Sequence, residues 1–373
     1  MLIINKLLNG GIDYMEVKSY FTDFISNIRL TQNQTNDLKT GHTTLRKRLL
    51  EDEDISPIII NTFLQGSYRR STAVRPKNNS KSDVDVIVVT NLNSEEYTPQ
   101  EALDLFVPFL EKHYSGKFEM QGRSIGIELS YVELDLVITS APSEIQEELL
   151  ESESVSISNS LEELPHWTLT KSWTAANENS KEEPSWKSEP LLIPDREKGN
   201  WEPTDPLAQI KWTWEKNTAC NSHYVNVVKA LKWWKKLNPD PKYPKGYPLE
   251  HLIGSCCPDN ISSVAEGVTL TLENIVSNYP TKPELKDHGV PEHDVFKRIT
   301  EEEYQEFYDL VSGAASLARQ ALDCEDKVES ISLWRELFGS KFPEPPSELI
   351  KSQNGAFTQR TGPTPSVSGG RFG

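Results

Sequence analysis

Hydrophobic residues recur at helical spacing in the first part of the chain and at strand spacing further on. Between residues 20 and 50 the apolar positions follow helical periodicity, first from Phe21 to Leu30 and then from Leu38 to Leu49, which predicts a long N-terminal helix. Residues 83–89 and 124–138 then alternate apolar and polar positions with a period of two, which is typical of half-buried strands. The first half of the chain therefore predicts a helix followed by a β-sheet.

Helical periodicity dominates the second half, most strongly over residues 221–237 and 301–322. Residues 141–200 are rich in Ser, Glu, Pro and Trp without periodicity. This stretch is too long for an ordinary connection, so we expect it to form the rim or lid of a site. The expected parts are a flexible extension at 1–15, a sheet lobe with the N-terminal helix at 16–205, a helical lobe at 206–345 and a disordered tail at 346–373.

Composition and charge exclude several classes of protein. With 373 residues the chain can bury a sizeable core in two lobes, and its formal net charge is −17. Such acidity argues against a protein that grips DNA or RNA, because that function needs clustered Lys and Arg. Four cysteines without a regular pairing pattern suit a reducing compartment. We see no signal peptide and no apolar run long enough to cross a bilayer, so we expect a cytoplasmic protein without membrane contact.

Paired carboxylates mark the first predicted strand. Asp83 and Asp85 are two residues apart, so on a strand they point to the same face. Two carboxylates that close repel each other unless a cation lies between them. For an isolated pair of this kind, two surface acids at the start of a strand are the better explanation.

A third carboxylate makes a metal site the better interpretation. Asp135 lies in an otherwise apolar strand, and burying a lone carboxylate is costly without a partner or a metal. Three aspartates on two neighbouring strands can hold two divalent ions roughly 3.5–4 Å apart, the arrangement used for phosphoryl displacement. Mg²⁺ takes few protein carboxylates and completes its shell with phosphate oxygens and water. We therefore predict that Asp83, Asp85 and Asp135 bind two Mg²⁺ ions, with Mn²⁺ as a possible substitute.

The pair Gly66–Ser67 precedes these strands and suits a phosphate. Glycine lets the backbone approach a phosphate without a Cβ atom in the way. A serine at a helix start offers its hydroxyl and a backbone N–H, where the helix dipole favours anions. Serine is also a common helix N-cap, which is the structural alternative for Ser67.

This combination resembles the DNA polymerase β-like nucleotidyltransferases, in which a Gly-Ser turn precedes an Asp-x-Asp strand and a third aspartate. Three further segments resemble the bacterial cyclic-oligonucleotide synthases, relatives of cyclic GMP-AMP synthase and oligoadenylate synthase: residues 64–74, 225–234 and 334–339. The similarity is strongest to the D-clade of these enzymes, found in phage-defence operons. It implies an α+β fold in which a mixed-sheet nucleotidyltransferase lobe and a helical lobe are braced by the long N-terminal helix.

The resemblance also implies roles for individual residues. Asp83 and Asp85 would hold the metal that accompanies the donor triphosphate, and together with Asp135 they would hold the metal at the attacking 3′-hydroxyl. The family places basic residues of the 225–234 helix against the triphosphate. These positions correspond to Lys229 and Lys232, which lie three apart on one helical face. A solvated basic face is the alternative for these lysines, and we expect Lys235 and Lys236 to lie on such a face.

Aromatic residues offer candidates for contact with a base. Tyr68, next to the Gly-Ser turn, or Trp201 is suited to stack on a purine, whereas packing inside the protein is the alternative for both.

The implied reaction is the stepwise condensation of ATP, and of GTP as a second substrate, into a cyclic oligonucleotide, with a cyclic trinucleotide as the expected product. Its effector would be reached through the product only. Expected protein partners are an operon-encoded regulator or a ubiquitin-like ligase acting at Gly373, since a flexible terminus ending in glycine suits conjugation. An ordinary frayed terminus is the alternative.

Two other functions remain open from the sequence. An enzyme of the same superfamily can modify a tRNA, a protein or a small molecule, although the net acidity disfavours a tRNA substrate. A non-catalytic scaffold is the second alternative, and the three aspartates disfavour it because a pseudoenzyme has no need for carboxylates that repel one another.

Overall fold

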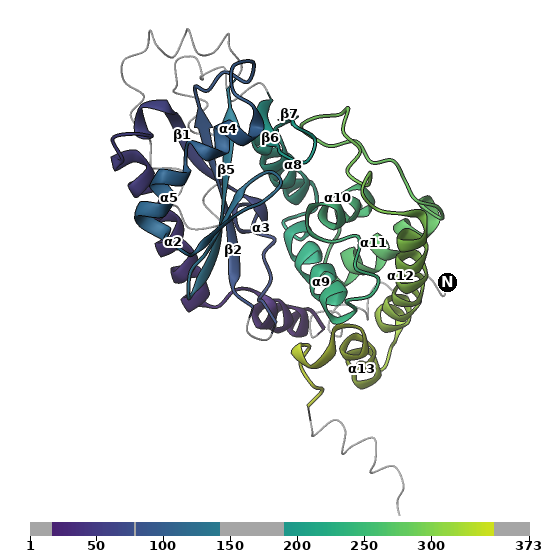
Figure 1. Cartoon of the computed structure of the whole chain (residues 1–373). Helices are drawn as coiled ribbons and strands as arrows, with labels where there is room; N and C mark the ends of the chain where they lie inside the picture. Colours follow the sequence, from purple (N-terminus) through teal and green to yellow (C-terminus); the bar gives the residue numbers. More distant parts are fainter. Residues whose placement is uncertain (1–16, 78–79, 142–189, 347–373) are drawn as a thin grey trace, which may run out of the picture.

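The chain folds into a sheet lobe and a helical lobe that lie side by side, as Figure 1 shows. The computed structural model describes residues 17–77, 80–141 and 190–346. The expected N-terminal extension, most of the expected rim at 141–200 and the tail with Gly373 lie outside these ranges.

Within the described residues, seven strands form one mixed sheet in the order β1-β2-β5-β4-β3, and β6 and β7 extend it from the end of β5. The strands are β1 (Ile59–Gln65), β2 (Ser82–Thr90), β3 (Phe118–Met120), β4 (Ile125–Glu128), β5 (Val132–Ser140), β6 (Leu191–Asp195) and β7 (Asn200–Thr204). β2 and β5 run parallel, whereas β1 pairs antiparallel with β2 and β4 pairs antiparallel with β5. The two central strands therefore end at the same edge of the sheet.

The alternation along β2 separates a core face from a site face. Val84, Val86 and Val88 are buried against helices on one side of the sheet. These helices are α2 (Gln32–Glu51), α4 (Pro99–Asp104) and α5 (Val107–Tyr114). On the other side, Asp83 and Asp85 come first along β2, and Ile87 follows in a small apolar cluster with Leu207 of the helix α8 (Pro206–Ala219). The acidic side chains therefore face the helical lobe.

The N-terminal helical segment is two helices instead of one. The first spans residues 17–28, and α2 begins after Thr31, whose side chain and Gln34 form a reciprocal capping box. Phe21 and Phe24 of the first helix are buried in the core of the helical lobe, whereas Leu45 of α2 is buried beneath the sheet. The segment thus braces both lobes, one helix on each.

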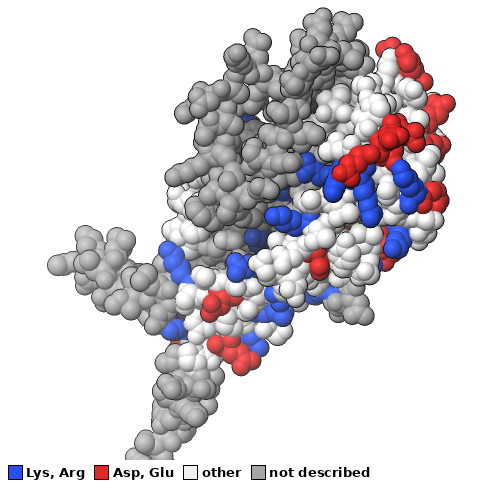
Figure 2. All heavy atoms as spheres, turned by 90° about the vertical axis from the view of Figure 1, so that its left-hand side faces the viewer, with Lys and Arg blue, Asp and Glu red and all other residues white. Residues whose placement is uncertain are grey.

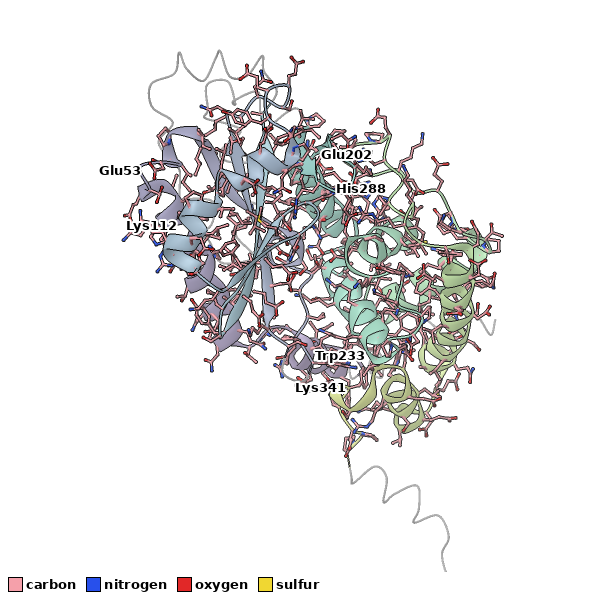
Figure 3. All side chains as sticks on the ribbon, in the orientation of Figure 1. Glu53, Lys112, Glu202, Trp233, His288 and Lys341 are labelled. Carbon is pink, nitrogen blue, oxygen red and sulfur yellow. The ribbon has the colours of Figure 1, made fainter. Side chains whose placement is uncertain are left out.

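The helical lobe consists of α8 (Pro206–Ala219), α9 (Tyr224–Leu237), α10 (Gly246–Cys256), α11 (Val264–Asn278), α12 (Glu301–Asp323) and α13 (Lys327–Phe338). The helices predicted over residues 221–237 and 301–322 are confirmed as α9 and α12. Trp233, labelled in Figure 3, is buried in the core of the helical lobe, and its indole N–H donates to the Phe338 carbonyl at 3.1 Å. None of the helices in the described ranges combines the length and apolar character needed to span a bilayer.

Candidate active site

The three predicted aspartates come together on the site face of the sheet. In the parallel pairing of β2 with β5, Asp85 is the direct partner of Asp135, and Asp83 is the partner of Glu133. Neighbouring strands lie roughly 4.8 Å apart, so the carboxylates of Asp85 and Asp135 project from adjacent positions. Asp83 is exposed, whereas Asp85 and Asp135 are partly buried.

Burial and mutual repulsion disfavour the charged forms of these groups. Burial, followed by the charges of Asp135 and Asp83, raises the pKa of Asp85 to about 7, although the Arg70 guanidinium opposes the shift. Burial and the charge of Asp83 raise the pKa of Asp135 to about 6, against a hydrogen bond from Gln121. Carboxylates that resist ionisation to this degree mark a place where a cation is strongly favoured.

The donor set fits a hard divalent cation such as Mg²⁺. Only carboxylate oxygens converge here, and oxygen is the ligand that Mg²⁺ requires. In the described parts of the chain, no three or more His, Cys, Asp or Glu side chains, these aspartates included, are arranged so that they could hold a metal ion as a group. An ion at this site would therefore take much of its shell from phosphate and water, as Mg²⁺ commonly does.

The Gly-Ser turn is built directly against the aspartates. Gly66 opens the short helix α3 (Gly66–Arg69) with a φ of +76°, and a Cβ atom at this position would lie 1.7 Å from Oδ2 of Asp85. Ser67 follows inside the first turn of α3. The N-cap residue is Gln65, so the interpretation of Ser67 as an N-cap is wrong. Ser67 therefore lies next to the carboxylate that the glycine touches.

Lys229, Lys232 and Lys236 lie on one face of α9, at positions i, i+3 and i+7. Burial, then the charges of Arg29 and Lys232, lower the pKa of Lys229 to about 8. Lys232 Nζ forms an ion pair with Glu250 Oε1 at 2.7 Å. Burial and the charge of Lys232 lower the pKa of Lys236, four residues further along α9, and the charge of Asp83 opposes this shift. Of the three lysines, Lys236 is therefore the one that the structure brings within the influence of Asp83.

The expectation for the other two lysines is therefore corrected. Lys235 does not lie on a solvated face, because its side chain is 6% exposed and its Nζ donates to backbone carbonyls of Asn238, Pro239 and Pro241. Lys236 is partly buried, and its Nζ donates to the Arg75 carbonyl at 3.1 Å. The spacing of Lys236 from Lys229 and Lys232 was the signal that could have added it to the candidate set.

Glu250 joins the two lobes behind the lysines. Besides Lys232, its carboxylate accepts from Nε of Arg70 at 3.2 Å and from Oγ1 of Thr72 at 2.8 Å. Burial alone would raise the pKa of Glu250, but Lys232 and Arg70 outweigh it and hold the pKa at about 2. This buried carboxylate therefore ties the segment after α3 to α9 and α10. Sequence reasoning gave Glu250 no role, because its partners are distant in the chain.

The candidate base contacts are both engaged in packing. Tyr68 is partly buried against the core of the sheet lobe, with its ring centroid 6.2 Å from that of His42. Trp201 packs against the same core, and its indole N–H donates to the Tyr97 carbonyl at 2.8 Å. The packing alternative therefore describes the contacts of both residues.

The four cysteines are free thiols, as expected.

Comparison with known proteins gives a consistent result. Residues 15–171 match the family model of the Second Messenger Oligonucleotide or Dinucleotide Synthetase domain. The chain is 49% identical to a cyclic AMP-AMP-GMP synthase of Enterobacter hormaechei subsp. hoffmannii, over 96% of this chain and 100% of that protein. It is 30% identical to a cyclic AMP-AMP-AMP synthase of an Acinetobacter species, over 93% of this chain and 91% of that protein.

The fold is also that of a solved structure. The Escherichia coli CdnC in its complex with HORMA-deltaN superposes with a TM-score of 0.61 at 17% sequence identity, over 87% of this chain and 98% of that one. At this identity the likeness establishes the fold alone.

Proposed function

This chain belongs to the cyclic-oligonucleotide synthases, which are nucleotidyltransferases, and from that premise we propose that it joins two adenosine nucleotides and one guanosine nucleotide into a cyclic trinucleotide. The observation that carries the proposal is the register of β2 and β5, which pairs Asp85 with Asp135 beside the Gly66 turn. The choice of bases rests on the similarity to the cyclic AMP-AMP-GMP synthase, which is higher than that to the cyclic AMP-AMP-AMP synthase.

Asp83, Asp85 and Asp135 would hold the metal ions. Two bound Mg²⁺ ions would neutralise the triphosphate and lower the pKa of the attacking 3′-hydroxyl. Ser67 offers its hydroxyl and backbone N–H to the donor phosphates. Asp135 accepts the proton of the 3′-hydroxyl as that oxygen bonds to the α-phosphorus and pyrophosphate leaves.

The lysines of α9 supply positive charge on the opposite wall. We expect Lys229 and Lys232 to contact the triphosphate from the helical lobe, and the charge of Asp83 acts on Lys236. Because Lys232 is already paired with Glu250, its ammonium is held in one place before nucleotide arrives. Most of the acceleration is expected from such positioning and from charge neutralisation.

The cellular setting follows from the family. We propose a cytoplasmic enzyme of anti-phage defence whose product alone carries the signal to its effector. An operon-encoded regulator is supported by the HORMA protein found in the complex of the structurally similar CdnC. Conjugation at Gly373 by a ubiquitin-like ligase stays a proposal from the sequence.

A tRNA substrate is disfavoured by the distribution of charge. The chain carries a formal net charge of −17. On the face of the sheet lobe drawn in Figure 2, Lys and Arg side chains are interspersed with Asp and Glu side chains. Binding a folded RNA depends on many phosphate contacts, and mixed charge does not favour them.

The product can be identified by omitting nucleotides one at a time. We expect the full-length enzyme with Mg²⁺, ATP and GTP to yield a phosphatase-resistant trinucleotide whose mass corresponds to two AMP and one GMP units. ATP alone is expected to give far less cyclic product. A product containing only AMP units would contradict the base assignment, and label transferred to added tRNA or protein would favour the alternative enzyme class.

A further inference from the structure

The side chain of Gln121 is fixed beside Asp135 in a defined orientation. Gln121 lies in the turn between β3 and β4, and its amide lies beside the Asp135 carboxylate, because Nε2 of Gln121 and Oδ1 of Asp135 both lie within 4 Å of the space above Gly126. The hydroxyl of Ser124 donates to Gln121 Oε1 at 2.8 Å. Because the amide oxygen is occupied by this donor, the amide nitrogen is the atom directed at the carboxylate.

Gly126 keeps open the space in which this contact is made. It is the β4 partner of Asp135 in the antiparallel pairing. A Cβ atom at Gly126 would lie 2.4 Å from Nε2 of Gln121 and 3.6 Å from Oδ1 of Asp135. A side chain at this position would therefore push the amide away while leaving the carboxylate in ordinary contact.

The turn itself is anchored to the β6–β7 hairpin. The backbone N–H of Arg196 donates to the Gly122 carbonyl at 2.9 Å, and its guanidinium donates to the Gln121 carbonyl at 3.1 Å. From the turn, Arg123 reaches Asp195 at 2.7 Å and Glu202, labelled in Figure 3, also at 2.7 Å. Backbone and side chain of Gln121 are thus both held before any substrate binds.

We propose that Gln121 is a positioning residue for nucleotidyl transfer, which fixes the Asp135 carboxylate in the orientation that receives the metal ion and the attacking 3′-hydroxyl. This inference rests on the proposed role of Asp135. Groups that orient a metal-binding carboxylate typically contribute 10- to 100-fold to metal affinity or activity. Because Gln121 belongs neither to the Gly66–Ser67 turn nor to α9, its removal should spare nucleotide binding.

The test combines kinetics with direct metal binding. We expect Gln121→Leu to lower kcat on the order of 10- to 100-fold while the KM for ATP changes less than about twofold. Titration of the nucleotide-free protein with Mn²⁺, followed by the electron paramagnetic resonance signal of the free ion, should show weaker binding by a similar factor. Gly126→Ala should reproduce both effects with Gln121 still present, and Ser124→Ala should show them in weaker form.

Gln305 supplies a matched control, because its amide donates to Asp309 at 2.9 Å on the exposed side of α12. Gln305→Leu should leave kcat and Mn²⁺ binding unchanged. Wild-type kcat and Mn²⁺ affinity in Gln121→Leu or Gly126→Ala would overturn the positioning role, as would a rise in KM without a change in kcat. If Gln121→Leu fails to fold, Gly126→Ala and Ser124→Ala decide between the two outcomes.

Asp135→Asn separates this inference from the proposed function. An inactive Asp135→Asn together with a fully active Gln121→Leu would refute only the positioning role. An active Asp135→Asn would refute the proposed catalytic site itself, and with it the basis of the inference.

Discussion

Gly66 and Asp85 pack so closely that a Cβ atom on the glycine would lie 1.7 Å from Oδ2 of the aspartate. The φ of Gly66 is +76°, a conformation that other residues adopt only with strain. The Gly66–Ser67 turn and the Asp85 carboxylate are therefore one packed unit, and neither can change without moving the other.

Two effects oppose any other residue at position 66: the strain of a positive φ, and the collision of a Cβ atom with Asp85. Gly66→Ala should abolish cyclic product, because the methyl group must displace either the turn or Asp85. Gly116 also has a positive φ, +69°, but a Cβ atom there would meet nothing within 4 Å. Gly116→Ala therefore isolates the strain alone, roughly 1–2 kcal/mol, and should retain activity. Equal activity of the two variants would show that the contact with Asp85 is unimportant.

The raised pKa of Asp85 predicts how stability depends on pH when divalent ions are removed. The folded state holds a proton on this group up to about pH 7, whereas the unfolded chain releases it near pH 4. The free energy of unfolding should therefore fall as pH rises between these values. In EDTA at pH 8, Asp85→Asn should be more stable than the wild type by roughly 1–3 kcal/mol, with a smaller difference at pH 5. Urea unfolding of the wild type and the variant at pH 8 and at pH 5 measures these differences in the free energy of unfolding. A less stable variant at pH 8 would contradict the account.

The sequence was sufficient to predict the part of the site that lies on regular strands. Alternation placed Asp83 and Asp85 on one face, and the apolar pattern around Asp135 predicted a second strand beside it. The two helices α9 and α12 were likewise predictable from their apolar periodicity. The break after residue 28 was missed although the sequence carries signs of it: no apolar residue falls between Leu30 and Leu38, and Thr31 with Gln34 has the spacing of a capping box.

Contacts between distant segments were outside the reach of sequence patterns. Gln121 lies in a short turn, and only the β4–β5 register brings it beside Asp135. Glu250 forms its buried ion pair with Arg70, which lies 180 positions away in the chain. Lys235 resembled a surface lysine, yet its side chain binds the carbonyls that follow α9. Each case depends on tertiary placement, which local propensity does not encode.

The buried ion pairs of Glu250 predict a large effect on stability. Glu250→Gln leaves Arg70 and Lys232 buried without a compensating charge, which should cost about 3–5 kcal/mol of unfolding free energy at pH 7. The pKa of Glu250 is lowered to about 2, so this contribution is lost as pH falls from about 4.5 toward 2. Thermal or urea unfolding checks both effects.

An exposed pair provides the control for Glu250. Glu344 pairs with Arg335 at 2.7 Å, and its side chain is 75% exposed. Glu344→Gln should change the unfolding free energy by less than about 1 kcal/mol. A Glu250→Gln effect no larger than that of Glu344→Gln would show that the interlobe ion pairs contribute little.

The lowered pKa of Lys229 predicts a pH-dependent affinity for ATP. Its pKa is about 8, so the free enzyme loses this positive charge as pH rises from 7 to 9. The KM for ATP should rise over that interval in the wild type. Lys229→Met should raise the KM about tenfold at pH 7 and remove this dependence on pH. Equal KM profiles for the wild type and Lys229→Met would exclude Lys229 from the triphosphate site.

The central claim is that the carboxylates of Asp85 and Asp135 carry the transfer reaction. It is tested most directly by mass spectrometry of the products formed from ATP and GTP with Mg²⁺, comparing the wild type with Asp85→Asn and Asp135→Asn. We expect a cyclic trinucleotide from the wild type, and neither linear nor cyclic product from either folded variant. Cyclic product made at the wild-type rate by either variant would contradict the account.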